Sequence, residues 1–332
     1  MDKLLLIAQF SPSDVGTHLE LAAREAGISV EQIDSSEGFG RLRSYRRIAR
    51  KILGDWPQHA LRFNRRVRRR LEGGDIRWLL TSGKAPVLAR TVRHASSLGV
   101  RTINYLTDDP SNPSIGTWWY RRALVDYSVL ASPRSATLQE LSLQFGGDVR
   151  HVQFGYGSKA HFPATGIAED EGDGDVLFVG YGDRDRIPFF LALHRAGIRP
   201  VLFGGGWERN RVLRAYYRGM ANLEQQRALY SSVPVSLCLV RRANRDEHVM
   251  RTFEAAAMGA CLLMESTSEH REIFGPDGEC VLYFDSMSSM VKACERLLAD
   301  EALRQELRAN VLRRMRLGSH TYGDRLARIL AD

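Results

Sequence analysis

Short apolar runs alternate with amphipathic segments along the first half of the chain. Apolar runs of about four to eight residues predict buried strands, and apolar spacings of three and four predict helices. The predicted strands are residues 3–10, 29–33, 76–82, 101–107, 127–132 and 149–154. The predicted helices are residues 19–26, 86–97 and 135–145. This alternation favours a parallel sheet with helices on both faces.

The same alternation restarts in the second half. Its predicted strands are residues 176–179, 200–203, 235–240, 261–265 and 280–284. Its predicted helices are residues 187–196, 223–231 and 249–258, followed by one or two long helices over 288–315 and a last helix at 323–330. The sequence therefore predicts an α/β protein with two Rossmann-like, doubly wound domains that face a cleft.

A stretch rich in glycine, proline and acidic residues separates the two halves, between Gly155 and Gly174. Such composition is typical of a linker. We expect an N-terminal domain over residues 1–156, a linker over 157–173 and a C-terminal domain over 174–319. The terminal helix, residues 320–332, is expected to pack back on the N-terminal domain.

The composition excludes several classes of protein. A hydrophobic content of 44% over 332 residues suits well-formed globular cores rather than disorder. No apolar stretch reaches the roughly 18 residues of a membrane span, and the chain start does not have the form of a signal peptide. The four cysteines form no CxxC pair, so neither a zinc site nor a disulfide framework is indicated. We expect a cytoplasmic protein without a metal.

Positive charge is concentrated in residues 41–70, which hold twelve Lys or Arg against the single acid Asp55. Because the whole chain has a net charge of only +8, the remainder is net acidic. Apolar residues at spacings of three and four predict amphipathic helices with basic outer faces. The segment is either a solvated helix face or a surface for an anionic acceptor or an anionic membrane, which would place the protein peripherally at the inner face of the membrane. Nucleic acid is the least favoured partner, because no recognised binding motif accompanies the charge.

A glycine-containing turn follows the predicted strand 176–179, with Gly180 and Gly182 inside it and Arg184 and Arg186 after it. Backbone amides of such a turn can approach an anion, and arginine adds charge-assisted hydrogen bonds to a diphosphate. The third glycine of a dinucleotide fingerprint and the Lys-Ser/Thr ending of a P-loop are both missing. A phosphate site and a plain strand-to-helix turn are therefore both open interpretations.

Three glycines, Gly204, Gly205 and Gly206, end the predicted strand 200–203 and precede Trp207. Because glycine has no side chain, a planar ring can pack directly against the main chain there. One interpretation places a nucleotide base at Gly204 and Gly205. The other is a turn that carries a structural tryptophan.

The most informative segment is the loop after the predicted strand 235–240 and the helix that follows it. A helix N-terminus at the end of a strand offers amides and a positive dipole to phosphate. Glu254, one or two turns into this helix, can accept both hydroxyls of a ribose through its two carboxylate oxygens. Asp246 precedes it by eight positions and can face the same cleft. By base rates alone, however, a helical Glu followed by alanines is more commonly an exposed surface residue.

Four stretches stand in order within the last hundred residues or so. They are Arg251-Thr252-Phe253-Glu254-Ala255-Ala256-Ala257-Met258-Gly259-Ala260, Cys261-Leu262-Leu263, Val281-Leu282-Tyr283-Phe284-Asp285 and His320-Thr321-Tyr322-Gly323-Asp324-Arg325-Leu326. Two supporting stretches are Gly204-Gly205-Gly206-Trp207 and Phe154-Gly155-Tyr156-Gly157. Together they resemble the CgeB-like branch of the group 1 glycosyltransferases, which have the two-domain GT-B fold.

The resemblance implies transfer of a sugar from a nucleoside diphosphate sugar to an unidentified acceptor, with retention of configuration and without a metal or other cofactor. Glu254 corresponds to the ribose ligand. Its neighbours Arg251, Thr252 and Phe253 are expected to contribute to the same nucleotide site. Asp246 falls at the first position of the family's acid-x7-Glu pair, near the transferred sugar, although Asp replaces Glu and the neighbouring Phe-Gly is absent. The counterparts of the Arg and Lys that neutralise the diphosphate are Arg184 and Arg186, with Gly182 beside them.

Other catalytic assignments and other functions stay open. His18, in a loop of the N-terminal domain, lies where an inverting enzyme of this fold could place a general base, or it is a helix-start residue without catalytic duty. Asp108 and Asp109 end a strand and either bind an acceptor hydroxyl or cap a turn. One alternative function is a sugar-nucleotide epimerase or hydrolase on the same fold. The other is a non-catalytic protein that binds an anionic partner through residues 41–70.

Overall fold

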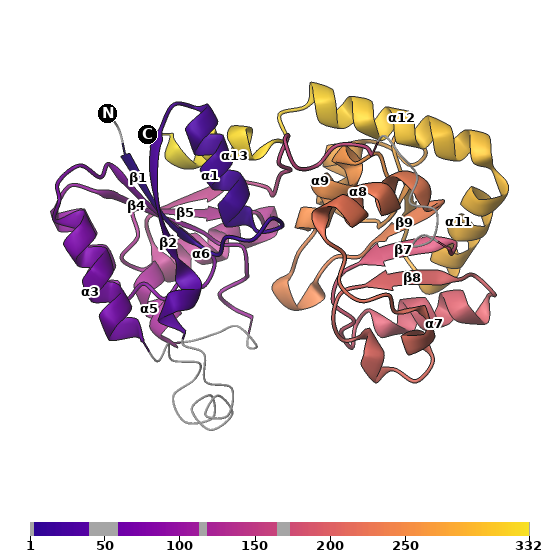
Figure 1. Ribbon diagram of the computed structural model, residues 1–332, viewed down its shortest axis with the longest axis horizontal. Coiled ribbons are helices and arrows are strands. Elements are labelled where there is room, and N and C mark those ends of the chain that lie inside the picture. The colour runs from indigo at the N-terminus through magenta and orange to yellow at the C-terminus, as the bar shows by residue number, and fades with distance from the viewer. Residues whose placement is uncertain (1–2, 40–58, 113–117, 165–172, 332) are drawn as a thin grey trace. The chain divides into compact units, whose positions relative to one another are not determined.

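The chain forms two compact units in the computed structural model, which describes residues 3–39, 59–112, 118–164 and 173–331. Unit 1 comprises Met1–Gln153, Ala243–Arg245 and Tyr322–Asp332, and unit 2 comprises Phe154–Arg242 and Asp246–Thr321. Each unit contains one parallel β-sheet flanked by helices (Figure 1). The prediction of two parallel-sheet α/β domains is confirmed.

The sheet of unit 1 has the strand order β2-β1-β3-β4-β5-β6, with all neighbouring strands parallel. The order reverses at β1, whose residues 4–8 are fully buried in accordance with their apolar character. The strands are β1 (Lys3–Ala8), β2 (Ser29–Asp34), β3 (Trp78–Ser82), β4 (Arg101–Tyr105), β5 (Val129–Ser132) and β6 (Asp148–His151).

Helices of unit 1 cover this sheet. α1 begins at residue 15, four residues before the predicted start. In its first turn Gly16 packs so closely that a Cβ there would lie 2.3 Å from the Gln9 carbonyl oxygen. α13, the last helix, packs against α1 (Figure 1). The helices are α1 (Val15–Glu25), η1 (Ser35–Gly38), α3 (Ala60–Leu71), α4 (Ala89–Ser97), α5 (Trp118–Leu124), η2 (Ser135–Thr137), α6 (Leu138–Phe145) and α13 (Tyr322–Leu330).

The basic segment is described only in part. Its first arginines and Lys51 lie outside the described residues, whereas α3 covers its second half and has the predicted amphipathic pattern. Apolar residues of α3 and Asn64 face the core, and Asn64 donates to the Pro86 carbonyl and accepts from the Leu88 N–H. This contact holds Leu88 extended, so α4 begins at Ala89 rather than at residue 86.

The sheet of unit 2 has the strand order β11-β10-β9-β7-β8, again all parallel. The chain proceeds from β7 to β8 on one side and then returns to place β9 on the other side of β7. This reversal is a topological switch point, and open α/β sheets bind ligands beyond the carboxyl ends of the strands at such points. The strands are β7 (Val176–Val179), β8 (Pro200–Phe203), β9 (Val235–Cys238), β10 (Leu262–Glu265) and β11 (Leu282–Phe284).

The helices of unit 2 follow the predicted pattern, and the segment 288–315 forms two helices. Asp300 separates them, because its side chain accepts from the Leu303 N–H and caps the second helix. The helices are α7 (Ile187–Arg195), η3 (Trp207–Arg209), η4 (Leu213–Tyr216), α8 (Leu223–Ser232), η5 (Arg242–Asn244), which runs into the unit 1 segment, α9 (Met250–Ala257), α10 (Ser268–Phe274), α11 (Met287–Ala299) and α12 (Glu301–Leu317).

One arginine links the long helix α12 to the ends of α8 and α9. Arg308 donates to the carbonyl oxygens of Tyr230, Ser231, Val233 and Gly259, at 2.6–3.1 Å. These contacts fix the end of α9 relative to the end of α8. All four cysteines are free and buried in this unit.

Within the described ranges, no helix combines the length and apolar character that a membrane crossing requires. Residues 165–172, the acidic part of the predicted linker, lie outside the described residues.

Candidate functional site

The start of α9 lies at the carboxyl end of the unit 2 sheet, after the connection from β9. Its N-cap residue, Val249, supplies no side-chain acceptor, and its own N–H donates to the Thr252 hydroxyl at 3.0 Å. The positive end of the helix dipole is therefore not neutralised by an N-cap side chain. Such a helix start favours an anion.

Glu254 is fully buried, so its interpretation as an exposed helix residue is wrong. The Arg251 guanidinium, one turn earlier on α9, contacts carboxylate oxygen Oε2. The other oxygen, Oε1, accepts no hydrogen bond from any described residue. A buried acceptor without a donor is costly, so its position requires an explanation such as a ligand.

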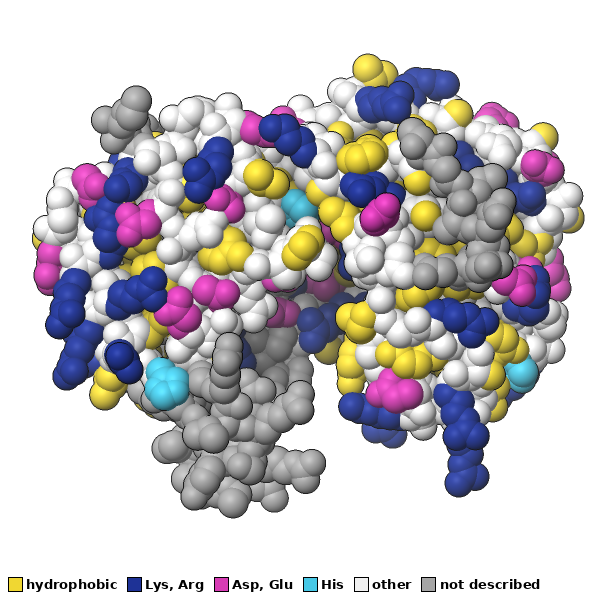
Figure 2. Space-filling model, in the orientation of Figure 1, with side chains coloured by type: hydrophobic (Ala, Val, Ile, Leu, Met, Phe, Trp, Pro, Cys, Tyr) yellow, Lys and Arg dark blue, Asp and Glu magenta, His cyan; other side chains and the backbone are white. Residues whose placement is uncertain are grey.

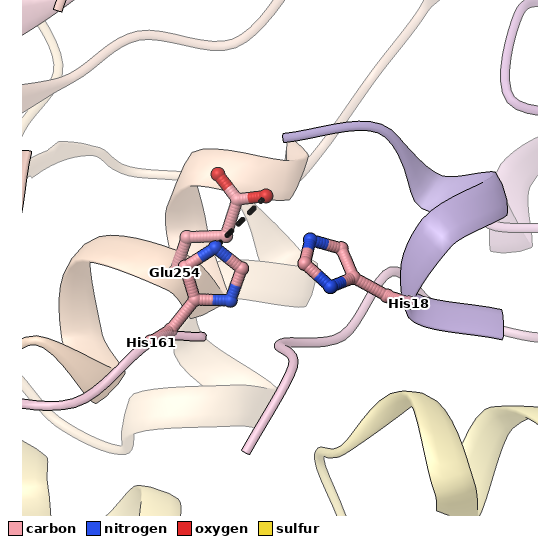
Figure 3. A group of neighbouring side chains, drawn as sticks. All are labelled: His18, His161 and Glu254. Atoms are coloured by element: carbon pink, nitrogen blue, oxygen red, sulfur yellow. Dashed lines mark ion pairs between the residues drawn. The ribbon is translucent and has the colours of Figure 1, made fainter. Parts of the chain in front are cut away.

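His161 lies beside this carboxylate (Figure 3), on a turn that follows the glycine segment at residues 155–157. Its Nδ1 accepts from the Gly157 N–H at 2.9 Å, and its Nε2 lies 3.8 Å from Glu254 Oε1. Burial and the charges of Arg251 and Arg227 lower the His161 pKa to about 3, so this close approach joins a neutral imidazole and a carboxylate. Sequence reasoning missed His161, because its partner is 93 residues away along the chain.

Thr252, predicted to contact the nucleotide, belongs to a buried hydrogen-bond network. Its hydroxyl lies 3.1 Å from His270 Nε2 and 3.6 Å from Cys238 Sγ. His270 Nδ1 lies 2.8 Å from the Glu265 carbonyl oxygen, and burial lowers the His270 pKa to about 4. The neutral ring therefore donates from Nδ1 and accepts at Nε2. This network holds α9 against β9 and β10.

Phe253, the other predicted neighbour of the ribose, is a core residue. It is fully buried and packs against the rings of His248 and His320, with centroid distances of 5.4 and 5.6 Å. His248 and Glu269 form a pair that resembles a catalytic His–acid dyad. The other ring nitrogen of His248, Nε2, accepts from the Phe154 N–H at 3.1 Å. With both ring nitrogens engaged, the His248–Glu269 pair has a structural role.

Asp246 is also buried, with 8% of its surface exposed, and its N–H donates to the Arg241 carbonyl oxygen. Its neighbour Glu247 accepts from the Ser268 hydroxyl at 2.6 Å and from the Glu269 N–H at 3.2 Å, which ties this loop to the start of α10. The catalytic role of Asp246 stays a prediction.

The two glycine-rich turns after β7 and β8 pair with each other. Gly180 donates to the Phe203 carbonyl, Gly182 to that of Gly205, and Gly204 to that of Gly219, all at 2.8–2.9 Å. These amides are therefore occupied within the protein. The glycines at 182 and 204 permit this close pairing, since a Cβ at Gly204 would lie 2.3 Å from the Gly180 carbonyl oxygen.

The ring that packs against these glycines is Trp207. A Cβ at Gly182 would lie 2.6 Å from the buried indole, whose Nε1 donates to the Gly180 carbonyl at 2.9 Å. On the outer side, the half-exposed ring of Tyr181 lies over Gly205 and Gly206. The turn thus carries a structural tryptophan and presents a tyrosine ring to solvent, and a base site at Gly204 and Gly205 stays a prediction.

Arg186 lies at the first turn of α7, with its guanidinium 5.3 Å from the centroid of Phe178. Its Nη1 donates to the Tyr181 carbonyl at 3.2 Å, but its buried Nε–H has no acceptor among the described residues. Burial lowers the Arg186 pKa, and Asp183 opposes this shift. Arg184, by contrast, is exposed.

A further arginine, Arg241, joins this group although sequence reasoning missed it. Its charge contributes to the lowered pKa of Arg186, so the two cations lie near each other after β7 and β9. Glu265, at the end of β10, accepts from the Val240 N–H at 2.7 Å and from Arg242 at 3.0 Å. The sequence did contain a signal for Arg241, because this basic residue directly follows the predicted strand 235–240.

In unit 1, His18 is buried on α1 and stacks on Tyr322 of α13, with 5.4 Å between ring centroids. Its role as a general base stays a prediction. Asp109 is bound by Arg245 at 2.6 and 3.1 Å and accepts from the Ser111 N–H at 2.8 Å. Asp109 therefore caps a turn and forms an ion pair within unit 1.

The fold defines the class of protein to which this chain is similar. A sucrose-phosphate synthase from Thermosynechococcus elongatus has 14% identity and a TM-score of 0.67, with 99% of this chain and 97% of that chain covered. The Anabaena protein HepE, in complex with UDP and glucose, has 13% identity and a TM-score of 0.62, with 99% and 98% covered. A Listeria monocytogenes protein assigned as a UDP-N-acetylglucosamine 2-epimerase has 15% identity and a TM-score of 0.57, with 99% and 95% covered. At these identities the likeness establishes the fold, which is of the GT-B type.

Residues 186–331 also match the model of a family described as "Glycosyl transferase-like". The matched region includes Arg186, Arg241 and Glu254. The comparison with curated proteins finds no significant relative. The C-terminal part of the chain is thus similar to glycosyltransferases, while the CgeB-like subgroup stays a prediction.

Proposed function

We propose that this protein is a glycosyltransferase that binds a nucleoside diphosphate sugar in unit 2 and transfers the sugar to an acceptor. The proposal rests on one observation about two buried polar atoms, a hydrogen-bond donor and a hydrogen-bond acceptor. Both lie on elements that begin beyond the carboxyl end of the sheet, and neither has a hydrogen-bond partner among the described residues. Within the described part of the chain, Arg186 Nε–H is a donor without an acceptor, and Glu254 Oε1 is an acceptor without a donor. A nucleoside diphosphate supplies the complementary groups, an anionic diphosphate and ribose hydroxyls.

In this proposal the diphosphate lies between the start of α9 and the arginines after β7 and β9. Arg186 and Arg241 provide positive charge, the exposed Arg184 adds a further cation, and the amides of the first turn of α9 provide donors. The leaving diphosphate gains negative charge in the transition state, and fixed cations stabilise it. This arrangement requires no metal, and we propose a metal-independent reaction.

The catalytic assignments rest on position along the chain and on the family resemblance. We propose that Asp246 lies near the transferred sugar and that the reaction retains configuration, as the acid-x7-Glu spacing implies. In an inverting reaction, His18 would instead be the candidate base. The stereochemistry of the isolated product distinguishes the two assignments.

The direct test is calorimetric titration of the full chain with UDP, GDP and ADP in the presence of EDTA. A thermal-shift panel of nucleotide sugars then identifies the donor, because a bound ligand raises the melting temperature by mass action. We expect binding of at least one nucleoside diphosphate without a metal. If none of the three binds, the proposal is wrong.

A sugar-nucleotide epimerase is the second candidate function, and the fold likeness to the Listeria protein favours it. The two reactions differ in their products. A transferase releases the nucleoside diphosphate only with a suitable acceptor, whereas an epimerase yields an epimerised donor without one. Incubation with donor alone, followed by nuclear magnetic resonance of the sugar, decides between them.

We also propose that α3 binds an anionic lipid surface. Arg62, Arg65 and Arg69 recur at helical spacing on its exposed face and form no ion pair with any described residue. Figure 2 shows Lys and Arg side chains gathered along the part of unit 1 where α3 lies. They line a groove of about 930 Å³ beside β2. Leu61, 53% exposed at the same helix start, adds an apolar contact.

Vesicle sedimentation tests the lipid proposal. We expect binding to vesicles with anionic phosphatidylglycerol but not to phosphatidylcholine alone, and loss of binding when these three arginines are replaced by glutamine. The matched control replaces three exposed arginines of unit 2, Arg209, Arg211 and Arg214, and changes the charge equally. Equal loss in both variants, or equally tight binding of duplex DNA, would contradict a lipid-specific surface.

A further inference from the structure

The groove of about 930 Å³ in unit 1 lies between α3 and the edge strand β2. One wall consists of residues of α3 and of His59, which precedes it. The other wall consists of Glu31 and Ile33 of β2 and Glu37 of η1. Five arginines and two glutamates line the groove, so its net charge is +3 with His59 neutral. The groove is therefore strongly basic.

Both glutamates of the groove are already paired with arginines of α3. Arg66 contacts Glu37, and Arg70 donates to Glu31 at 2.5 Å. Arg70 also donates to both carboxylate oxygens of Asp75, at 2.7 and 3.0 Å. These contacts engage two of the five arginines, and the other three supply the net charge.

The other three arginines are Arg62, Arg65 and Arg69, which are exposed and form no ion pair with any described residue. Their spacings of three and four place them on one side of the helix. At about 1.5 Å per residue, Arg62 and Arg69 are about 10 Å apart along the helix axis. A guanidinium can bind two oxygens of a phosphate through parallel hydrogen bonds. This row therefore suits a ligand with several anionic oxygens.

The two walls of the groove rest on the same short loop. Phe63 of α3 is buried in the core, and Asn64 binds the Pro86 carbonyl and the Leu88 N–H. On the other wall, Gly38 of η1 packs so closely on Pro86 that a Cβ there would lie 2.3 Å from its Cγ atom. The separation of the walls is thus fixed by the core, without a ligand.

We propose that this groove binds the terminal phosphate of a lipid head group, a phosphomonoester. The inference rests on the proposed contact of α3 with anionic lipid and specifies which head group is recognised. A phosphomonoester carries a charge of about −1.5 to −2 at pH 7 and three acceptor oxygens. A phosphodiester head group carries a single charge and fewer free oxygens. The three arginines without a described partner match the phosphomonoester better in charge and in hydrogen-bonding capacity.

Vesicle sedimentation of the full chain compares two anionic lipids mixed with phosphatidylcholine. Phosphatidic acid ends in a phosphomonoester, and phosphatidylglycerol contains a phosphodiester. The anionic fraction is adjusted until both vesicles have the same zeta potential, so that only the head group differs. The variant Arg62→Lys/Arg65→Lys/Arg69→Lys keeps the charge and the helix propensity but removes the planar donor geometry.

The matched control, Arg209→Lys/Arg211→Lys/Arg214→Lys, makes the same change at exposed positions of unit 2. Melting temperatures report whether each variant is folded. We expect the wild type and the control to bind phosphatidic acid vesicles about tenfold more tightly than phosphatidylglycerol vesicles. In the α3 variant the preference should fall to about twofold or less, while binding to phosphatidylglycerol is retained.

Equal binding of the wild type to both vesicles overturns this inference and leaves the lipid contact of α3 intact. The same preference in the α3 variant also overturns it, because a diffuse basic surface does not distinguish lysine from arginine. Free glycerol 3-phosphate that binds as tightly as the vesicles, in the wild type but not in the α3 variant, would overturn the assignment to a lipid. If the wild type binds neither vesicle, the lipid contact and this inference are wrong together, whereas the proposed glycosyl transfer is tested separately by nucleotide binding.

Discussion

Arg251 and Glu254 lie one turn apart on α9, and the Arg251 guanidinium binds a single oxygen of the buried Glu254 carboxylate. This pairing neutralises the charge that burial would otherwise penalise, while the second oxygen has no donor among the residues that the structure describes. The carboxylate is thus stable inside unit 2 and still able to accept a hydrogen bond. A purely structural ion pair would have no need to leave one oxygen unsatisfied.

Glu254→Gln should weaken nucleoside diphosphate binding about tenfold to a hundredfold, because a hydrogen bond to a charged group contributes about 1.5–3 kcal/mol. Calorimetric titration measures the change. Glu306→Gln, at an exposed position of α12, is the matched control and should have no effect. Unchanged affinity in a folded Glu254→Gln protein would exclude Glu254 as a ligand.

Arg186→Gln should weaken a nucleoside diphosphate at least tenfold and leave the much weaker binding of the nucleoside unchanged, because only the diphosphate needs the charge. Competition titration with both ligands measures the difference. Arg195→Gln, at the exposed end of α7, controls for the loss of one positive charge from the unit. Equal weakening of nucleoside and diphosphate would argue against a phosphate contact at Arg186.

Gly182→Ala should lower the free energy of unfolding by about 1–3 kcal/mol, because the new Cβ would lie 2.6 Å from the buried Trp207 ring. Gly205→Ala is the matched control, since its Cβ would be at least 3.4 Å from its neighbours. Urea unfolding followed by tryptophan fluorescence measures both. If Gly182→Ala has wild-type stability but binds no nucleotide, the glycine serves the ligand rather than packing.

The buried His270 predicts a loss of stability in mild acid. Its pKa falls from 6.5 in the unfolded chain to about 4 in the folded protein, because burial disfavours the charged ring. Between these values the unfolded state binds more protons, so the free energy of unfolding decreases as pH falls from 6.5 to 4, by about 1.4 kcal/mol per pH unit. His161, with a pKa of about 3, contributes in the same direction.

His270→Asn should reduce this pH slope by about one proton, because Asn retains a donor for the Glu265 carbonyl but does not titrate. Urea midpoints at pH 6.5, 5.5 and 4.5 provide the slope. His194→Asn, at an exposed position of α7, controls for the change of residue type. A slope in His270→Asn identical to that of the wild type would mean that the pKa of His270 does not differ between the folded and unfolded states.

The spacing of apolar residues was sufficient to predict the architecture, because it directly reflects which faces of each strand and helix are buried. The start of α1 shows the limit of that approach. The prediction omitted the first turn of α1, which holds Val15 and His18. In that turn Gly16 lies so close to Gln9 that no Cβ fits, and apolar spacing does not encode this contact. The start of α4 was likewise decided by the Asn64 side chain of another helix.

The sequence by itself determined two parallel α/β units and identified α9 as the most informative helix, since apolar spacing and the order of motifs are local properties of the chain. The tertiary structure decided the state of each side chain. It buried Glu254 and brought His161 to it from 93 residues away. It also occupied the amides of Gly182 and Gly204 with the carbonyl oxygens of Gly205 and Gly219. Long-range contacts decide which polar atoms are satisfied, and those contacts are not encoded in any local pattern.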